Sequence, residues 1–196
     1  MVETLKYKEN FVIILESIKM LMEEKLMDLK VLLSEEEIQD RLTQMAREID
    51  TYYKGEEILV ICVLRGAIYF MTDLTKKMKT PMALDFIRVS SYDGTETTGK
   101  INVVNDITED IKGKKVLLVE DIIDTGYTLN ALKQYLLSKE PEDLKVAVLA
   151  DKKERRRVDV DIDFIGYEIP NNYVVGYGFD YYNTYRNLPY VGYIEN

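Results

Sequence analysis

A hydrophobic run followed at once by acidic residues and a turn of small residues is the feature that most limits how this chain can fold. Residues 116–119 read Val-Leu-Leu-Val, a strand-like run that ends in Glu120 and Asp121. An Asp-Thr-Gly-Tyr-Thr turn at residues 124–128 then opens a helical pattern. A strand that passes through a short turn into a helix is typical of an α/β sheet. We therefore expect an α/β domain around this stretch.

The residue types of this turn suit a phosphate. Backbone N–H groups and hydroxyls at the start of a helix can converge on one point, at the positive end of the helix dipole. The residues that supply them are Thr125, Gly126, Tyr127 and Thr128. The preceding carboxylates suit sugar hydroxyls or a phosphate-bound Mg²⁺. We expect a site for a phosphorylated sugar; the alternative is that Glu120 and Asp121 only end a strand and Asp124 only caps a helix.

Length and composition favour a single globular domain. The chain has 196 residues, of which 46% are hydrophobic and 31% charged, enough for a substantial core. The net charge of -9 makes long-range attraction to nucleic acid or to an anionic membrane surface unexpected. Histidine is absent, so histidine-based triads and zinc sites are excluded, and acid–base chemistry must use Asp, Glu, Lys or Tyr.

The sequence predicts a cytoplasmic protein. No apolar stretch approaches the roughly eighteen residues of a membrane span, and the N-terminus lacks a basic region followed by an apolar core and a cleavage site. The single Cys62 lies in the apolar run at residues 58–63 and is expected to be a buried, unpaired thiol. Both features fit a reducing cytosol.

Residues 1–30 differ in composition from the rest, being rich in Leu, Met, Ile, Lys and Glu and without Gly or Pro. Apolar residues recur at helical spacing between Phe11 and Met22, which predicts a helical extension that packs on the domain or on a neighbouring subunit. A membrane-surface role is the weaker alternative, because the polar face is not strongly basic. Residues 31–196 are expected to form the single domain.

Helix and strand patterns alternate through this domain. Ser34 and Glu37 form a capping-box pattern, which predicts the start of a helix. The continuous apolar run at residues 58–64 predicts a parallel strand that is covered on both faces, and residues 116–119 and 144–150 are also typical of strands. We therefore expect a mostly parallel central sheet flanked by helices, with ligands at the carboxyl ends of the strands.

Two neighbouring segments leave alternatives open. Residues 82–89 alternate apolar with smaller or charged side chains and are expected to form an edge or half-covered strand. Residues 90–100 are rich in Ser, Thr, Gly and Asp, so they form either a loop that closes over a ligand or a plain solvated loop.

Two common nucleotide motifs are not supported. The sequence has no Gly-x-x-x-x-Gly-Lys-Ser/Thr run, and the glycine pair at Gly176 and Gly178 lacks the third glycine and the helix of a dinucleotide fingerprint.

The stretch at residues 116–128 instead resembles the phosphoribosyl-diphosphate signature of the phosphoribosyltransferases. Further segments resemble the hypoxanthine-guanine phosphoribosyltransferase family, at residues 63–66, 90–92, 151–152, 164–170, 173–180 and 185–189. The resemblance implies the type I phosphoribosyltransferase fold, with a small hood formed from terminal segments.

The resemblance implies that the stretch at residues 116–128 holds the phosphoribosyl group. Glu120 and Asp121 match acids that face the ribose hydroxyls of 5-phosphoribosyl 1-diphosphate. Asp124 matches a general base near N7 of the purine. The residues that match the 5′-phosphate turn are Thr125, Gly126, Tyr127 and Thr128.

Pyrophosphate and metal contacts are implied in other segments. The residues that match pyrophosphate contacts are Leu64, Arg65, Gly66 and Arg186. A cis peptide joins the first two in the family. Arg65 stands where lysine is common, and the two are not equivalent as phosphate or subunit contacts. Asp180 matches a Mg²⁺ ligand, and Glu120 and Asp121 are further candidates for the metal.

Purine recognition is implied further along the chain. Lys152 matches a lysine that donates to the oxygen at C6, which distinguishes hypoxanthine and guanine from adenine because an amino group cannot accept this bond. Tyr173, which could otherwise be a core aromatic, matches a residue that stacks on the base, and Val174 one whose backbone contacts its edge. Ser91 and Tyr92 match the closing loop. The basic side chains Lys153, Arg155, Arg156 and Arg157 are interpreted as a solvated or phosphate-attracting face without a catalytic role.

The resemblance therefore implies a Mg²⁺-dependent purine salvage enzyme, a homodimer or homotetramer. It would transfer the phosphoribosyl group to N9 of hypoxanthine, and of guanine, to give IMP or GMP and pyrophosphate. One alternative is a regulatory module that keeps the pocket and binds RNA or DNA, against which the acidic balance argues. Another is a transferase for a different base, such as xanthine.

Overall fold

The computed structural model describes residues 29–91 and 101–194. The extension predicted over residues 1–30 lies outside this range except for its last two residues, and Lys30 already begins a strand. The elements in chain order are β1 (Lys30–Leu33), α2 (Glu35–Tyr53), β2 (Ile58–Leu64), α3 (Ile68–Lys77), β3 (Met82–Ser91), β4 (Ile101–Asn105), β5 (Lys115–Ile123), α4 (Tyr127–Leu137), β6 (Asp143–Asp151), a 3₁₀ turn η1 (Lys153–Arg155), β7 (Phe164–Glu168), β8 (Val174–Val175) and β9 (Val191–Tyr193).

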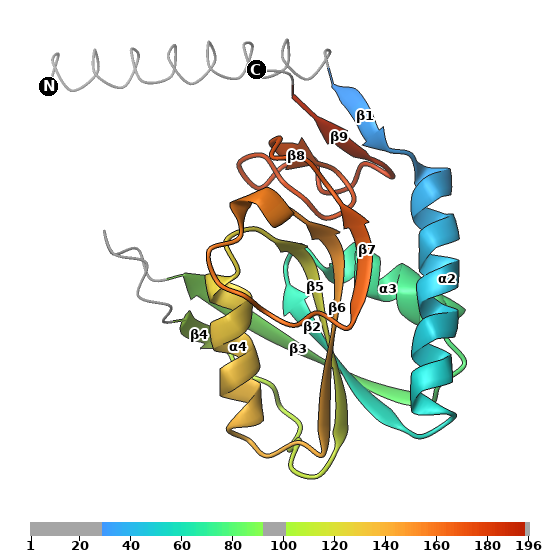
Figure 1. The fold of residues 1–196 in the computed structure, drawn as a ribbon, viewed down its shortest axis with the longest axis vertical. Helices are drawn as coiled ribbons and strands as arrows, with labels where there is room; N and C mark the ends of the chain where they lie inside the picture. Colours follow the sequence, from blue (N-terminus) through green and yellow to red (C-terminus); the bar gives the residue numbers. More distant parts are fainter. Residues whose placement is uncertain (1–28, 92–100, 195–196) are drawn as a thin grey trace, which may run out of the picture.

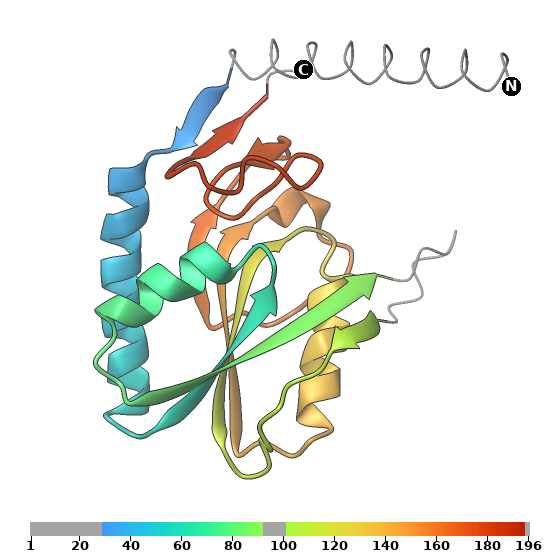
Figure 2. The ribbon, with the colours of Figure 1, turned by 180° about the vertical axis from the view of Figure 1, so that it is seen from behind.

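A six-stranded sheet of order β4-β3-β2-β5-β6-β7 lies at the centre of the described residues (Figure 1). Every neighbouring pair is parallel except β3 and β4. Helices α2 and α3 cover one face and α4 covers the other, as the two opposite views show (Figure 2). The predicted α/β class with a mostly parallel sheet is confirmed. None of the helices in the described ranges combines the length and the apolar character needed to cross a membrane.

Helix α2 begins at the capping box that the sequence predicts. The Ser34 Oγ accepts a hydrogen bond from the N–H of Glu37 at 3.2 Å, and the Glu37 carboxylate accepts one from the N–H of Ser34 at 2.8 Å. These bonds satisfy donors that the helix itself leaves unpaired.

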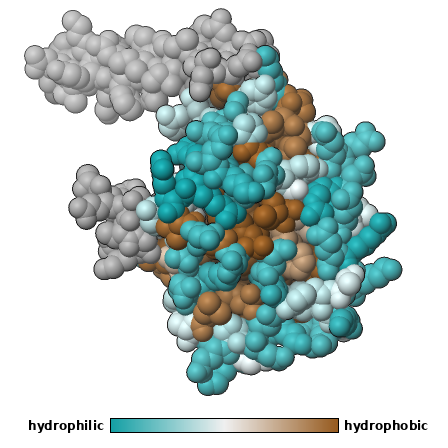
Figure 3. Space-filling view, in the orientation of Figure 1, coloured by the Kyte–Doolittle hydropathy of each residue, from teal (hydrophilic) through white to brown (hydrophobic). Residues whose placement is uncertain are grey.

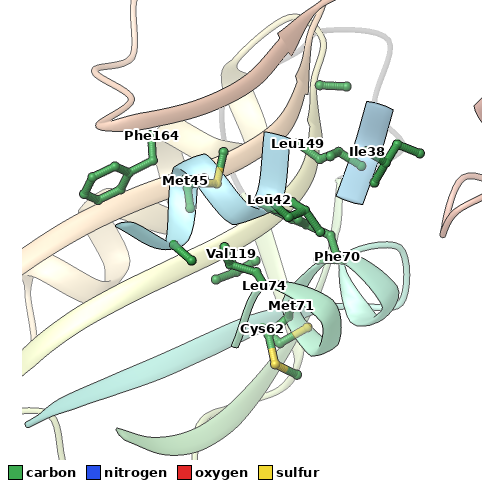
Figure 4. Close-up of a cluster of buried hydrophobic side chains, with 14 of the residues drawn as sticks. Ile38, Leu42, Met45, Cys62, Phe70, Met71, Leu74, Val119, Leu149 and Phe164 are labelled. Atoms are coloured by element: carbon green, nitrogen blue, oxygen red, sulfur yellow. The ribbon is translucent and has the colours of Figure 1, made fainter. Parts of the chain in front are cut away.

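The buried core between the helices and the sheet follows the predicted apolar stripes. Side chains of α2 and α3 pack against those of the central strands, among them Ile38, Leu42, Phe70, Leu74, Cys62, Val119 and Leu149 (Figure 4). Cys62 is fully buried and unpaired, as predicted, and burial raises the pKa of its thiol to about 12. Outside this core, the face seen in Figure 3 is mainly hydrophilic around a central hydrophobic patch.

Strand β3 differs from one of the two expectations. It is half-covered, since Leu84 and Phe86 are 47% and 39% exposed, but it is not an edge strand because β4 lies outside it. Its buried face carries Asp85, whose carboxylate accepts hydrogen bonds from the N–H groups of Thr108 and Glu109 at 2.7 and 2.8 Å. The loop before β5 thus gives this buried charge its partners.

A second sheet joins the two ends of the described chain. Its three strands are antiparallel in the order β1-β9-β8, with Tyr193 paired to Lys30 on one side and to Val174 on the other. This sheet lies beyond the carboxyl ends of the central strands in both views (Figures 1 and 2). The predicted hood of terminal segments is confirmed.

Candidate active site

A cavity of about 320 Å³ opens at the carboxyl ends of β2 and β5. Segments that are far apart in the sequence meet in its wall, and most of the predicted site residues are among them. They are Leu64, Arg65, Gly66, Glu120, Asp121, Asp124, Thr125, Gly126, Thr128, Asp180 and Arg186. Ligand sites of parallel α/β sheets lie at this end of the strands.

The phosphate turn lies directly at the start of α4. Gly126 is the residue before the helix, and its φ of 88° is one that glycine adopts most easily. The N–H groups of the first helical turn have no partners within the helix, and here they lie beside the cavity that Thr125 and Thr128 line. Tyr127 begins the helix but is not among the described residues that line the cavity. This geometry suits a phosphate group.

The two adjacent acids lie inside β5 and not at its end. The strand continues to Ile123, because Glu120 and Ile122 pair with Val148 and Ala150 of β6. Burial raises the pKa of both acidic side chains, and the charge of Asp121 raises the pKa of Glu120 further. Ionisation of this pair therefore calls for compensating hydroxyl donors or a cation, which matches the chemistry of a ribose or of Mg²⁺.

The predicted pyrophosphate loop packs directly on this acid pair. The peptide between Leu64 and Arg65 is cis, as the family resemblance implies. A Cβ added to Gly66 would lie 1.6 Å from the Asp121 Oδ2, and one added to Gly178 would lie 2.0 Å from the carbonyl oxygen of Gly66. Glycine at both positions therefore lets β2, β5 and the C-terminal segment approach closely.

Arg186 and Asp180 form an ion pair on the cavity wall, with 2.6 Å between Nη2 and Oδ1. The Arg186 Nη1 also donates to the carbonyl oxygen of Gly178 at 2.5 Å, and the charge of Arg186 lowers the pKa of Asp121 against the larger effect of burial. In the described ranges, no three acidic or cysteine side chains gather closely enough to form a cation site on their own. A Mg²⁺ ion here would take most ligands from substrate phosphates and water, as this ion usually does.

The candidate base Asp124 lies close to two cations. Its Oδ1 is buried and has no hydrogen-bond partner, although the Arg155 Nε lies 2.7 Å away in an ion pair without hydrogen-bond geometry. Lys152 is 7% exposed; burial lowers the pKa of its amine, and the nearby charge of Asp124 partly offsets this effect. The N–H of Lys152 donates to the carbonyl oxygen of Ile123 at 2.9 Å, and Ile123 pairs with Asp151, so the predicted base and the predicted C6-oxygen donor follow adjacent positions of two neighbouring strands.

The predicted stacking residue Tyr173 belongs to the hood and not to the core. It is 51% exposed, and its hydroxyl donates to the carbonyl oxygen of Asp180 at 3.0 Å. Its ring meets that of Tyr181 edge to face, with centroids 5.5 Å apart. Val174 is buried in β8, where it pairs with Tyr193. Neither Tyr173 nor Val174 is among the described residues that line the 320 Å³ cavity.

The predicted closing loop is only partly within the described ranges. Ser91 ends β3, and Tyr92 lies outside the residues that the structure describes. The closing role of this loop stays a prediction.

The basic run after Lys152 is not simply a solvated face. Arg155 contacts Asp124, and Arg156 forms a two-point contact with Asp151, whose side chain is 1% exposed. Of these four basic residues, Lys153 and Arg157 are exposed and contact neither Asp151 nor Asp124. The available signal was Asp151 itself, because an acid at the end of a buried strand requires a partner.

Comparison with known proteins agrees with this geometry. Residues 29–182 match the family model described as a phosphoribosyl transferase domain. The hypoxanthine-guanine phosphoribosyltransferase of Aquifex aeolicus is 46% identical over 170 residues, which cover 86% of this chain and 96% of that protein. A crystal structure of the hypoxanthine-guanine phosphoribosyltransferase of Bacillus anthracis has a TM-score of 0.82 and 44% identity, covering 85% and 98% of the two chains.

A second kind of relative is much longer than this chain. The bifunctional protein TilS/HprT of Listeria monocytogenes is 42% identical over 167 residues, which cover 85% of this chain. This chain spans only 26% of that protein.

Proposed function

The chain belongs to the phosphoribosyltransferase family and, within it, to the hypoxanthine-guanine phosphoribosyltransferases, and from this premise we propose that it acts in purine salvage. It transfers the 5-phosphoribosyl group of 5-phosphoribosyl 1-diphosphate to N9 of hypoxanthine and guanine. The products are IMP or GMP and pyrophosphate. One observation carries the proposal: a single cavity joins a helix start, an acid pair and the loop beside Arg186, which together suit the two phosphate ends and the ribose between them.

The residues at the pyrophosphate end stabilise the leaving group. As the bond from C1 to the diphosphate breaks, positive charge builds on the ribose and negative charge on the departing anion. Backbone N–H groups around Arg65 and the Arg186 guanidinium would stabilise the anion, and the acid pair would bind the ribose; all of these residues line the same cavity. When Mg²⁺ is bound, it neutralises charge on the diphosphate; Glu120, Asp121 or Asp180 would hold it through carboxylate oxygens.

The residues at the purine end prepare the nucleophile. Asp124 takes or shares the proton on N7, which makes N9 the better nucleophile. Lys152 donates to the oxygen at C6, and Tyr173 stacks on the ring. A 6-amino base would place a donor against the lysine, which itself can only donate, so adenine is disfavoured.

The remaining parts of the proposal concern the surroundings of the reaction. The segment carrying Ser91 and Tyr92 closes over the site and excludes water that would otherwise capture the ribosyl cation. The enzyme works in the cytoplasm as a homodimer or homotetramer, with residues 1–30 as an extension that packs on the domain or on a neighbouring subunit.

Steady-state kinetics with four bases test the proposal. Hypoxanthine, guanine, xanthine and adenine are each supplied with 5-phosphoribosyl 1-diphosphate and Mg²⁺, and with excess chelator as a control. We expect turnover with the first two bases, preferred over adenine by about 10³-fold or more in kcat/KM, and loss of turnover with the chelator. Turnover with xanthine as the best base would revise the substrate, and no turnover with any base would contradict the enzyme itself.

A further inference from the structure

The amine of Lys152 depends on the backbone for its position. Among the described residues it has no hydrogen bond or ion pair, although the residue is 7% exposed. The backbone is well held: the N–H of Lys152 donates to the carbonyl oxygen of Ile123 at 2.9 Å, and its carbonyl accepts from the N–H of Arg155 at 2.8 Å. The direction of this side chain is therefore set by the turn at residues 152–160.

A buried ion pair closes that turn. The Arg156 Nε and Nη2 lie 3.0 and 2.8 Å from the two carboxylate oxygens of Asp151, the residue directly before Lys152. The Arg156 Nη1 also donates to the carbonyl oxygen of Val160 at 3.1 Å. The Asp151 side chain is 1% exposed and that of Arg156 is 18% exposed. Such a two-point contact fixes orientation as well as distance.

The same turn rests against the phosphate site. The N–H groups of Arg157 and Val158 both donate to the carbonyl oxygen of Thr125, at 2.9 and 3.2 Å. The carbonyl oxygen of Val158 leaves no room for a Cβ on Gly126, which it would approach to 2.7 Å. In Figure 1 the orange segment after β6 folds back beside the start of α4. The turn thus contacts the phosphate site while it carries the purine donor.

We propose that Arg156 is a positioning residue for purine selection. Acting through Asp151, it fixes the turn that aims Lys152 at the substituent on C6, without touching the substrate itself. This inference rests on the proposed function. Loss of the Arg156 contacts should affect the purine more than the phosphoribosyl group, because Gly126 is also held by α4 through the N–H of Asn130 at 2.9 Å.

The decisive variant is Arg156→Lys, with Arg157→Ala as its matched control. Lysine keeps a positive charge beside Asp151, so no unpaired charge is buried, but it cannot make the two-point contact. We expect KM for hypoxanthine to rise about tenfold, and the preference for hypoxanthine over adenine to fall about tenfold, because small displacements of a positioned group are costly. KM for 5-phosphoribosyl 1-diphosphate should change by less than about threefold. The exposed Arg157→Ala should change none of these values appreciably.

A folded Arg156→Lys with unchanged hypoxanthine KM and unchanged base preference would overturn the proposal. Equal rises in both substrate KM values would also overturn it, since they indicate a general loss of structure. If Arg156→Lys does not fold, Asp151→Asn weakens the same contact from the other side and carries the same expectations.

Hydrogen exchange separates this inference from the proposed function, because it requires no turnover. The amides of Lys152, Arg157 and Val158 should exchange faster in Arg156→Lys than in the unchanged protein, and at the normal rate in Arg157→Ala. Unaltered protection contradicts the positioning role even in an active enzyme. Absence of turnover in the unchanged protein contradicts the proposed function and leaves the exchange result decisive for the turn.

Discussion

The phosphate half and the purine half of the site are built in different ways. The proposed phosphate half is centred on one stretch, residues 120–128, in which β5 runs through a turn into α4. The loop at Gly66 packs directly on this stretch, and Gly178 packs on the loop. The proposed purine half takes Lys152, Tyr173 and Val174 from separate segments, each held by its own contacts. A phosphate is the same in every substrate, so fixed backbone N–H groups are enough for it. A 6-oxopurine differs from adenine in the substituent on C6, so a side chain must be aimed at that position.

Asp124→Asn should have the largest effect on turnover, because Asp124 lies in the phosphate stretch but is proposed to act on the purine. Asparagine keeps the size of the side chain but cannot take a proton, so we expect kcat to fall about 10³-fold with every base. Binding of 5-phosphoribosyl 1-diphosphate, measured by calorimetry, should be retained. Asp159→Asn is the control, since Asp159 is exposed. Unchanged turnover in Asp124→Asn would remove the general base from the mechanism.

Lys152→Gln should lower activity with hypoxanthine but not with adenine, because it changes only the purine half. The loss of the charged donor should lower kcat/KM for hypoxanthine about 10²-fold and leave the poor activity with adenine within about threefold. Lys153→Gln, at an exposed neighbour, is the matched control. If the activities with hypoxanthine and with adenine fall by the same factor, Lys152 does not recognise the substituent on C6.

Gly178→Ala should affect the phosphate half for every base alike. A Cβ there would lie 2.0 Å from the carbonyl oxygen of Gly66, at a φ of 105° that already disfavours alanine. We expect KM for 5-phosphoribosyl 1-diphosphate to rise about tenfold with an unchanged order of bases. Gly55→Ala has a similar φ of 84° with nothing within 4 Å, so it reports the backbone cost alone. A changed base preference in Gly178→Ala would mean that the halves are not separable.

Asp85→Asn should lower stability without changing the base preference, because Asp85 lies in β3 outside both halves. Burial acts to raise the pKa of Asp85, but hydrogen bonds from the N–H groups of Glu109, Phe86 and Thr108 outweigh it and the pKa lies below the ordinary value of 3.8. The ionised carboxylate therefore stabilises the fold above that value, and this contribution is lost as the pH falls through the pKa of the folded protein.

The measurement is the free energy of unfolding in denaturant at several pH values. Asp85→Asn should be less stable by about 2 kcal/mol near pH 7, and the difference should shrink below about pH 3.8. The base preference should not move. A difference that is constant across this range would contradict the assigned role of the ionised carboxylate.

The sequence predicted the parts whose causes are local. The capping box at Ser34 and Glu37, the covered strand at residues 58–64 and the turn at Gly126 each follow from neighbouring residues, and all appear as expected. Tyr173 was placed outside the core by its motif, and its exposure agrees.

The errors of sequence-based prediction concern contacts that the local residue pattern does not show. Strand β5 continues through Glu120 because β6 supplies hydrogen bonds there, and β3 is internal because β4 returns beside it. Arg156 reads as one charge of a solvated or phosphate-attracting run; Asp151 at the end of a buried strand calls for a partner, but the pattern does not show which of the neighbouring cations supplies it. Charge patterns show where ions lie along a chain but not which of them are desolvated.

The hood sheet has a consequence for the order in which the protein is made. Strand β1 is among the first described segments to leave the ribosome, yet its partner β9 is among the last. The whole strand–turn–helix unit of the phosphate half is synthesised before β9 exists to pair with β8 and fix Val174. Since a domain generally folds as a unit, the hood sheet that fixes Val174 forms only after residues 191–193 have been synthesised.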